Sequence, residues 1–200
     1  RWIGGIVNAS PKISDLIMEN KCEAYNLPQG VIAQLYREIA AKRPGLFTKV
    51  GMRTFVDPRL DGGKISDCTT EDLVELVEIA GDEWLFYKSF PINVGLIRGT
   101  VADEKGNLTL EKEGLHMEVL PVAQAAKNSG GIVIAQVESL AAAGSLNPKD
   151  VRVPGILVDY IVVSQPENHF QTENTQYNPA FSGQVKVPLD SVSPLKLDER

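Results

Sequence analysis

Apolar residues recur at helical spacing in two stretches near the start of the chain. The first stretch follows Ser10 and Pro11, which suit the N-cap and the first position of a helix, so a short helix is predicted. The second stretch predicts an amphipathic helix that begins after Gly30 and ends before Pro44. The apolar positions are Ile13, Leu16 and Ile17 in the first helix and Val31, Ile32, Leu35, Tyr36, Ile39 and Ala40 in the second.

A different pattern, typical of strands, occupies the middle of the chain. Residues 73–79 alternate apolar and acidic side chains, and residues 84–90 are rich in aromatic residues that favour β-structure. The turn residues Gly81 and Asp82 lie between them and predict a β-hairpin. One more strand is expected over residues 93–100, before a turn made of charged and small residues.

Residues 117–163 have a pattern typical of a helix followed by strands. Residues 117–127 predict a helix in which Pro121 is an unfavourable member, and the glycine pair at 130–131 ends it. Continuous apolar runs at 132–137 and 155–163 are typical of strands buried on both faces of a parallel sheet. We therefore predict an α/β fold with a mostly parallel sheet flanked by helices and an antiparallel hairpin insert.

The last part of the chain is polar. Residues 165–180 are rich in Gln, Asn and Pro and are expected to form a long surface segment, and the end at 195–200 is expected to be frayed. With 200 residues, one domain is the default, or one domain with a small extension. We expect a domain over residues 1–163 and a linker or extension over residues 164–200.

Composition and charge narrow the class of protein. The chain has 20 basic and 26 acidic residues, a net charge of −6 and 43% hydrophobic residues, which is typical of a globular protein and argues against a nucleic-acid binder. Its longest uncharged apolar stretch is well short of the ~20 residues of a membrane span. Cys22 and Cys68 are interpreted as buried or incidental thiols, and a reducing, cytoplasmic compartment is expected. Because the chain opens with Arg1, it is expected to begin inside a fold.

The sequence lacks the usual motifs for metal binding, for a serine nucleophile and for nucleotide binding. His116 and His169 lie far apart and have no further His or Cys at ligand spacing, so no metal site is predicted. G-x-S-x-G, Walker and G-x-G-x-x-G patterns do not occur. The loop over residues 49–64 is the least generic segment, because its glycines allow close approach to a ligand and its cations could bind a carboxylate or phosphate. A charged surface loop is the alternative.

Short motifs along the chain resemble a known family. They are NLPQG at 26–30, TKVG at 48–51, TFVDPR at 54–59, GGK at 62–64, FYK at 86–88, IRGT at 97–100, AD at 102–103, GN at 106–107, AQAAKNSGG at 123–131 and VIAQVE at 133–138. In this order they closely resemble the first half of the family I coenzyme A transferases, in the acetate, propionate and 3-oxoacid branch. The resemblance runs from Arg1 to about Val163 and implies a partial N-terminal CoA-transferase domain.

The activity that the resemblance implies is transfer of CoA from a short-chain acyl-CoA to a free carboxylate. In the family, a glutamate forms an acyl-glutamyl anhydride and then a glutamyl-CoA thioester, so that one difficult transfer becomes two easier ones. The resemblance places that glutamate in the second half, outside this chain. Glu104, which matches Glu-x-Gly as text, is interpreted as a turn residue, and Glu138 as an acid that the family keeps without using it as the nucleophile. No catalytic residue is expected in this chain, which is expected to be inactive alone.

Substrate-binding residues are carried over by the same resemblance. Gln29 matches a family glutamine at the end of a strand that faces the active site, where its amide can donate to an acyl oxygen and Gly30 allows close approach. The loop at 51–64 matches a loop that lines the acyl pocket, and Arg53 stands where related sequences often carry a small residue. The expected substrate-binding set is Gln29, Gly30, Gly51, Thr54, Phe55, Gly62 and Gly63.

Partners are also implied by the family. They are an acyl-CoA, a small carboxylate, a complementary C-terminal half in the same or another chain, and further copies in a homo-oligomer. No nucleic acid, membrane, metal or permanent cofactor is expected, and CoA enters as a substrate. A non-catalytic acyl-CoA-binding or assembly module that pairs with a complementary chain is the alternative, and a regulator built on the same fold is a third.

Overall fold

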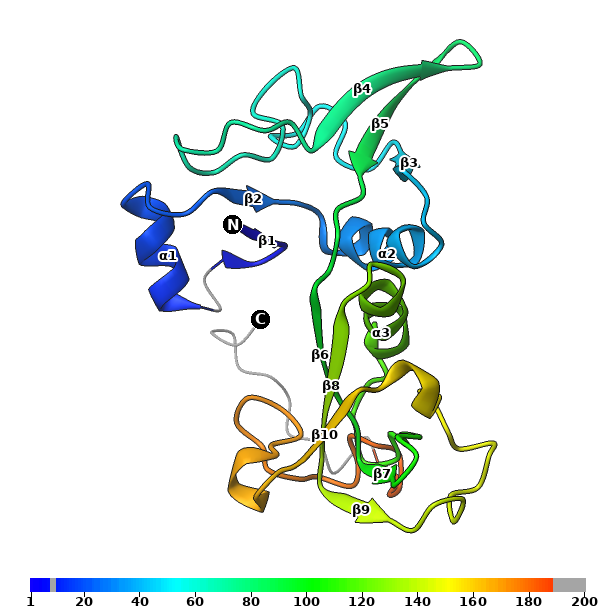
Figure 1. The fold of residues 1–200 in the computed structure, drawn as a ribbon. Coiled ribbons are helices and arrows are strands. Elements are labelled where there is room, and N and C mark those ends of the chain that lie inside the picture. Colours follow the sequence, from blue (N-terminus) through cyan, green and yellow to red (C-terminus); the bar gives the residue numbers. More distant parts are fainter. Residues whose placement is uncertain (8–9, 189–200) are drawn as a thin grey trace. The chain divides into compact units, whose positions relative to one another are not determined.

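The computed structural model describes residues 1–7 and 10–188, and these form two compact units (Figure 1). Unit 1 contains Arg1–Gly95 and Gln124–Gly131, and unit 2 contains Leu96–Ala123 and the chain from Ile132 onward. The frayed end predicted for residues 195–200 lies outside the described residues. The predicted boundary between residues 163 and 164 stays a prediction.

Unit 1 joins a parallel pair of strands, helices and an antiparallel sheet. Strands β1 and β2 pair in parallel, and the second sheet has the antiparallel order β3-β5-β4. The two predicted helices and the predicted hairpin are confirmed. The elements are β1 (Trp2–Gly4), α1 (Pro11–Met18), β2 (Ala24–Asn26), α2 (Gln29–Ala40), β3 (Gly45–Thr48), β4 (Val74–Ile79) and β5 (Asp82–Lys88).

Two local details in unit 1 differ from the predictions. The turn of the hairpin consists of Ala80 and Gly81, both with positive φ, while Asp82 already pairs with Ile79 in the sheet. This two-residue turn follows the right-handed twist of the strands. At the start of α1, Ser10 occupies the N-cap but its side chain caps nothing.

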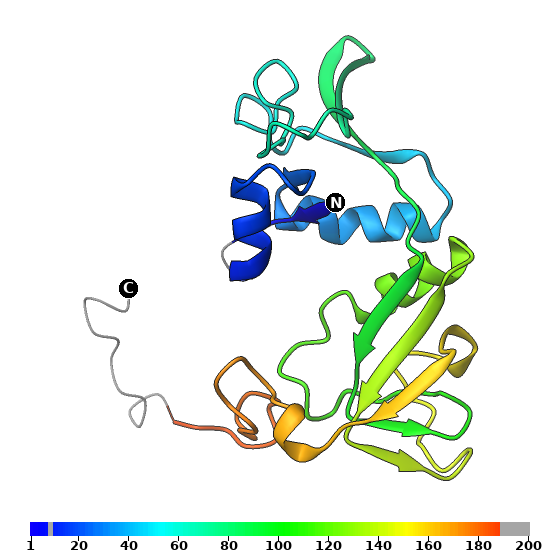
Figure 2. The ribbon, with the colours of Figure 1, turned by 60° about the vertical axis from the view of Figure 1, so that its left-hand side comes forward.

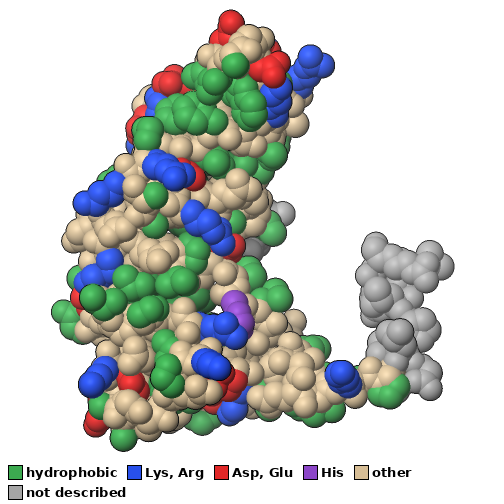
Figure 3. Space-filling model, turned by 90° about the vertical axis from the view of Figure 1, so that its right-hand side faces the viewer, with side chains coloured by type: hydrophobic (Ala, Val, Ile, Leu, Met, Phe, Trp, Pro, Cys, Tyr) green, Lys and Arg blue, Asp and Glu red, His purple; other side chains and the backbone are tan. Residues whose placement is uncertain are grey.

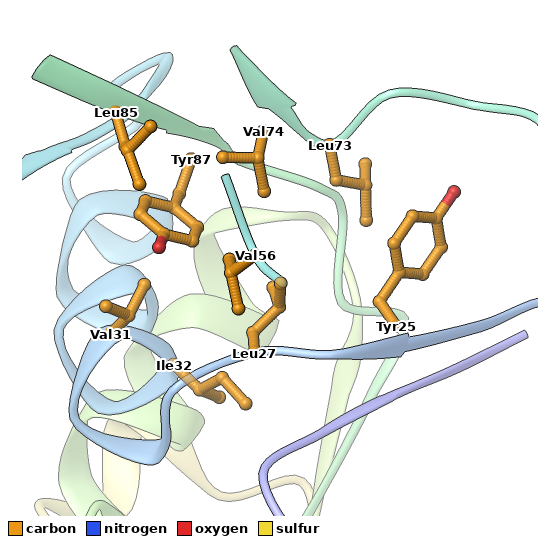
Figure 4. Packing of buried hydrophobic residues seen from close by; sticks show 9 residues of the cluster. All are labelled: Tyr25, Leu27, Val31, Ile32, Val56, Leu73, Val74, Leu85 and Tyr87. Carbon is orange, nitrogen blue, oxygen red and sulfur yellow. The ribbon is translucent and has the colours of Figure 1, made fainter. Parts of the chain in front are cut away.

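The hydrophobic core of unit 1 gathers side chains from four parts of the chain (Figure 4). Strand β2, helix α2, the loop after β3 and the β4–β5 hairpin all contribute. Burying such side chains stabilises each by roughly 1.5–3 kcal/mol relative to exposure. The cluster consists of Tyr25, Leu27, Val31, Ile32, Val56, Leu73, Val74, Leu85 and Tyr87.

Helix α3 (Val119–Asn128) begins in unit 2 and ends in unit 1, where Ala125 packs with Leu35 and Ile39 of α2. Pro121 is its third residue, in the first turn, where a backbone N–H has no intrahelical partner to lose. The predicted glycine stop is confirmed, because Gly130 has a φ of 80° and the next N–H donates to the Ala126 carbonyl at 2.9 Å.

Unit 2 is built on two small sheets. One has the order β10-β8-β6, with β8 and β10 parallel, and the three strands lie side by side in Figures 1 and 2. The other pairs β7 and β9 in parallel. The elements are β6 (Val94–Arg98), whose first two residues belong to unit 1, β7 (Val101–Asp103), β8 (Ile132–Val137), β9 (Ser139–Ala141), η2 (Gly155–Leu157), β10 (Tyr160–Val163) and η3 (Pro166–Asn168).

The predicted burial of two strands was wrong in part. In β8 only one face is fully buried, by Val133, Ala135 and Val137, whereas Ile132 is 39% exposed. The run at 155–163 begins as the η2 turn, and only its second half forms β10, which is the edge strand and is largely exposed. An edge strand has a sheet neighbour on one side only, so an apolar run there need not be buried.

The fold class is confirmed as mixed α/β, with parallel pairs and an antiparallel sheet. The predicted sheet is, however, divided into several small sheets. Residues 165–180 are mostly turns and exposed, as predicted, although His169 within them is buried. Within the described part of the chain, no helix has the length and apolar character needed to cross a membrane.

Candidate functional site

Gln29 lies where a strand gives way to a helix in unit 1. Strand β2 ends at Asn26, Pro28 is the N-cap of α2, and Gln29 is the first helical residue rather than the last strand residue. The side chain is exposed and lies against Gly5, since a Cβ atom at Gly5 would stand 2.6 Å from the Gln29 Oε1. A glycine at position 5 is therefore needed for the observed position of this amide.

Gly62 and Gly63 lie at the end of the 49–64 loop, and Gly63 attaches this end to strand β2. Both have positive φ, 62° and 76°, and both are buried. The Gly63 carbonyl accepts from the Asn26 N–H at 2.8 Å, and a Cβ at Gly63 would lie 2.8 Å from the Leu27 Cδ2. The end of the loop therefore contacts Asn26, which lies three residues before Gln29 in the sequence.

Gly51 and Thr54 form a turn at the other end of the loop. The Gly51 carbonyl accepts from the Thr54 backbone N–H at 3.1 Å and from its Oγ1 at 2.6 Å. Tyr87 contacts the residue before this turn, because its hydroxyl donates to the Val50 carbonyl at 2.7 Å. That hydroxyl would be 2.5 Å from a Cβ at Gly51, so only glycine fits. Burial raises the pKa of Tyr87 to about 12, so it stays a neutral donor.

A buried carboxylate organises the middle of the loop. Asp57 accepts from the backbone N–H groups of Arg53 and Arg59 at 2.8 and 3.0 Å, and from Arg59 Nε and Nη2 at 2.9 and 2.8 Å. The Arg59 guanidinium also reaches Glu83, at 3.0 Å. The hydrogen bonds from Arg59 hold the pKa of Asp57 well below its usual range, so the carboxylate stays ionised.

Several other side chains of the loop face solvent. Thr54 and Phe55 are exposed, and a hollow of about 290 Å³ is lined by Arg53, Asp57, Arg59 and Leu60. Glycines that shape the turns and exposed cationic and apolar side chains are a combination suited to binding a small anionic organic molecule. On the face drawn in Figure 3, Lys and Arg side chains are scattered among other atoms and form no continuous basic patch.

The two glutamates set aside in the sequence both make contacts in unit 2. Glu104 lies in the predicted turn, which is confirmed, and its Oε2 accepts from the Ala143 N–H at 3.0 Å. Glu138 follows β8 and forms a 2.6 Å ion pair with the Lys112 Nζ. These contacts are of the kind that hold loops and strand ends in place.

The cysteines and histidines make no common cluster. Cys22 and Cys68 are free thiols that are half-buried rather than buried. His169 is buried, with its Nε2 3.6 Å from the Glu113 carboxylate and its Nδ1 3.3 Å from the Gln136 amide. Over residues 1–7 and 10–188, no group of three or more His, Cys, Asp or Glu side chains could hold a metal ion.

Sequence reasoning missed three residues that shape this site. Gly5 belongs to none of the motifs that the sequence offers, yet the Gln29 side chain lies against it. Asp57 was noted in the sequence only within the TFVDPR motif, although an Asp two residues before an Arg, beside turn glycines, is a pattern that could have marked it. Tyr87 gave no local signal, because its contact with Val50 joins segments far apart in the sequence.

Comparison with known proteins identifies the class. The family described as coenzyme A transferase matches residues 2–164, and the chain belongs to this family. It is 56% identical to the caffeate CoA-transferase of Acetobacterium woodii over 201 residues, which cover 100% of this chain and 38% of that protein.

One solved structure and one relative that is named as a subunit complete the comparison. The crystal structure of the acyl-CoA transferase YdiF from Escherichia coli O157:H7, in a thioester complex with CoA, is 42% identical with a TM-score of 0.88, covering 92% of this chain and 38% of that one. The alpha subunit of acetoacetyl-CoA:acetate/butyrate CoA transferase from Clostridium acetobutylicum is 29% identical, and 81% of this chain covers 66% of it. The chain thus spans less than two fifths of the length of the first two relatives.

Proposed function

We propose that this chain is part of the N-terminal half of a CoA-transferase that moves CoA between a short-chain acyl-CoA and a free carboxylate of the acetate, propionate or 3-oxoacid type. The observation that carries the proposal is the coenzyme A transferase match over residues 2–164. The reaction passes through a glutamyl-CoA thioester whose glutamate lies outside this chain. CoA is a substrate, and no permanent cofactor takes part.

In this proposal the chain contributes substrate contacts rather than the nucleophile. The Gln29 amide donates to the acyl oxygen, where negative charge develops when the thioester carbonyl is attacked. Gly30 allows the acyl group to approach the start of α2, and the loop with Gly51, Thr54 and Phe55 lines the acyl pocket. Gly63 holds that loop against β2, and Gly62 bonds to Asp57 within the loop, which supports the placement of the loop beside Gln29.

The rest of the site belongs to a complementary half, in the same chain or in another. YdiF is more than twice as long as this chain, which supports a complementary half in the same chain. The clostridial relative is named as an alpha subunit, which supports a complementary half in another chain. Assembly into a homo-oligomer and a cytoplasmic location belong to the same proposal, and the free state of both cysteines is compatible with a reducing compartment.

The test uses the complete protein, with the chain joined to or paired with its complementary half. CoA transfer from acetyl-CoA or propionyl-CoA is measured with acetate, propionate, acetoacetate and, because of the caffeate relative, caffeate as acceptors. Hydroxylamine or borohydride trapping of the intermediate is expected to label the complementary half and leave residues 1–200 unmodified. Binding of acyl-CoA without turnover would instead favour the non-catalytic module.

The role of Gln29 is tested by Gln29→Ala, with Gln34→Ala as a control in an exposed position of the same helix. Loss of one donor to a developing oxyanion lowers kcat by roughly 10²-fold. We expect that loss for Gln29→Ala, with little change in the KM for acyl-CoA, and none for Gln34→Ala. Equal kcat values for the two variants would contradict the assigned role.

A further inference from the structure

Four cations lie in the 49–64 loop, and three of them are paired. Lys49 Nζ is 3.1 Å from the Asp82 carboxylate and Lys64 Nζ is 2.6 Å from that of Asp72. Arg59 pairs with Asp57. The fourth, Arg53, is exposed and has no carboxylate partner among the described residues, so its guanidinium is available to a ligand.

The backbone of Arg53 is held in a conformation that its side chain disfavours. Its φ is 62°, in the left-handed region that glycine adopts without cost. The conformation is maintained because the Arg53 N–H donates to the buried Asp57 Oδ2 at 2.8 Å. Folding alone would be served better by glycine here, so packing does not explain a long cationic side chain at this position.

The surroundings of Arg53 suit an oxyanion. Arg53 lines the hollow of about 290 Å³ together with Asp57, Arg59 and Leu60. Asp57 does not compete for its guanidinium, because both Asp57 oxygens already accept from Arg59 and from backbone N–H groups. A planar guanidinium with five N–H donors binds carboxylate or phosphate oxygens through charge-assisted hydrogen bonds.

We propose that Arg53 is a specificity-determining residue that binds an anionic group of a substrate. The inference rests on the proposed CoA-transferase function and goes beyond it by naming the residue that selects the charged group. Two kinds of group have the required chemistry. One is a carboxylate, either that of the acceptor acid or one on its acyl chain. The other is the phosphates of CoA. In both cases oxygen atoms accept hydrogen bonds from the Arg53 guanidinium.

The test compares Arg53→Gly with Lys49→Gln in the complete protein. Arg53→Gly removes the cation and places at this positive φ a residue that adopts it without strain. The melting temperature of the variant is therefore expected to equal or exceed that of the wild type. Lys49→Gln removes a cation of the same loop that is paired with Asp82. Initial rates give KM separately for the acceptor acid and for acyl-CoA, with dephospho-CoA thioesters to distinguish the phosphates.

Arg53→Gly is expected to raise one of the two KM values by about tenfold, the effect of losing one charge-assisted hydrogen bond. If the KM for the acceptor acid rises, the group bound by Arg53 is a carboxylate. If the KM for acyl-CoA rises, and rises less when the dephospho-CoA thioester is used, the group is a phosphate of CoA. Arg53→Lys should restore part of the loss. Unchanged KM values, or equal changes in Lys49→Gln, would overturn the proposal.

Failure of the proposed function would be visible in a different measurement. If the wild-type protein transfers no CoA, calorimetric binding of CoA and of propionate to wild type and Arg53→Gly replaces the kinetic test. Weaker binding of either probe to Arg53→Gly supports the anion site without transferase activity. Equal binding of both probes, or no binding to the wild type, rejects it.

Discussion

Replacing Asp57 by Asn is expected to destabilise the chain by about 2–3 kcal/mol. The Asp57 side chain is fully buried and accepts four hydrogen bonds. An Asn side chain can keep the two on its oxygen, from the Arg59 N–H and Nε. Its NH₂ group then faces the Arg53 N–H and Arg59 Nη2, two donors at 2.8 Å in the wild type. The exposed guanidinium can turn to water, so the free-energy loss comes mainly from the unpaired Arg53 N–H.

Urea unfolding of the chain at pH 7 measures this loss as a change in the midpoint at constant m. Glu83→Gln is the matched control, because it removes the other carboxylate partner of Arg59 but at an exposed position. Exposed ion pairs contribute less than about 1 kcal/mol, so the control should differ little from the wild type. Trypsin cleavage after Arg53 and Arg59 reports opening of the loop and should accelerate only in Asp57→Asn.

Equal stability and equal cleavage of the two variants would contradict the role assigned to Asp57. If Asp57→Asn unfolds at the same urea concentration as Glu83→Gln, and its loop is cleaved no faster, the buried carboxylate does not organise the loop. The explanation offered for the conformation of Arg53 would then fail as well. Faster cleavage at an unchanged midpoint would show that only the loop, and not unit 1, depends on Asp57.

Three further outcomes are expected. The lowered pKa of Asp57 lies below its unfolded value, so its stabilising effect is present above about pH 4 and is lost as pH falls further; acid unfolding followed by circular dichroism should be less steep in Asp57→Asn. Tyr87→Phe removes the hydrogen bond to Val50 and should cost about 1 kcal/mol below pH 10 in urea unfolding, with the difference shrinking between pH 10 and 12, where the tyrosine hydroxyl ionises in the unfolded chain but stays neutral in the folded one. Gly63→Ala combines a positive φ with a contact 2.8 Å from Leu27 and should lower the unfolding free energy by about 2–4 kcal/mol, measured in the same way.

Local patterns in the sequence predicted the elements that depend on near neighbours. The helical spacing after Pro11 and after Gly30, the alternation of the hairpin and the glycine pair that ends α3 all correspond to structure. These features follow from periodicity and from the backbone freedom of glycine, which act over a few residues. The ordered motifs in the same residues also identified the family, which the match over 2–164 confirms.

Candidate site residues were only partly accessible from the sequence. Gly51, Gly62 and Gly63 were proposed because the glycine-rich loop allows close approach to a ligand and matches a family loop, and each of them has a positive φ in the structure. The roles of Asp57 and Tyr87 were not visible. Their partners are set by how the loop folds back onto itself and onto the hairpin, and no spacing rule encodes that.

The amino-acid sequence alone was enough to locate the helices, the hairpin and the glycine turns, and to identify the family of the chain. Tertiary structure alone decided that β8 buries one face, that η2 replaces half of a predicted strand, and that Gly5 receives the Gln29 amide. It also decided which of the four loop cations has no carboxylate partner among the described residues. The physical reason is that burial and charge pairing are properties of residues brought together from distant parts of the chain, whereas periodicity and turn preference are properties of neighbours.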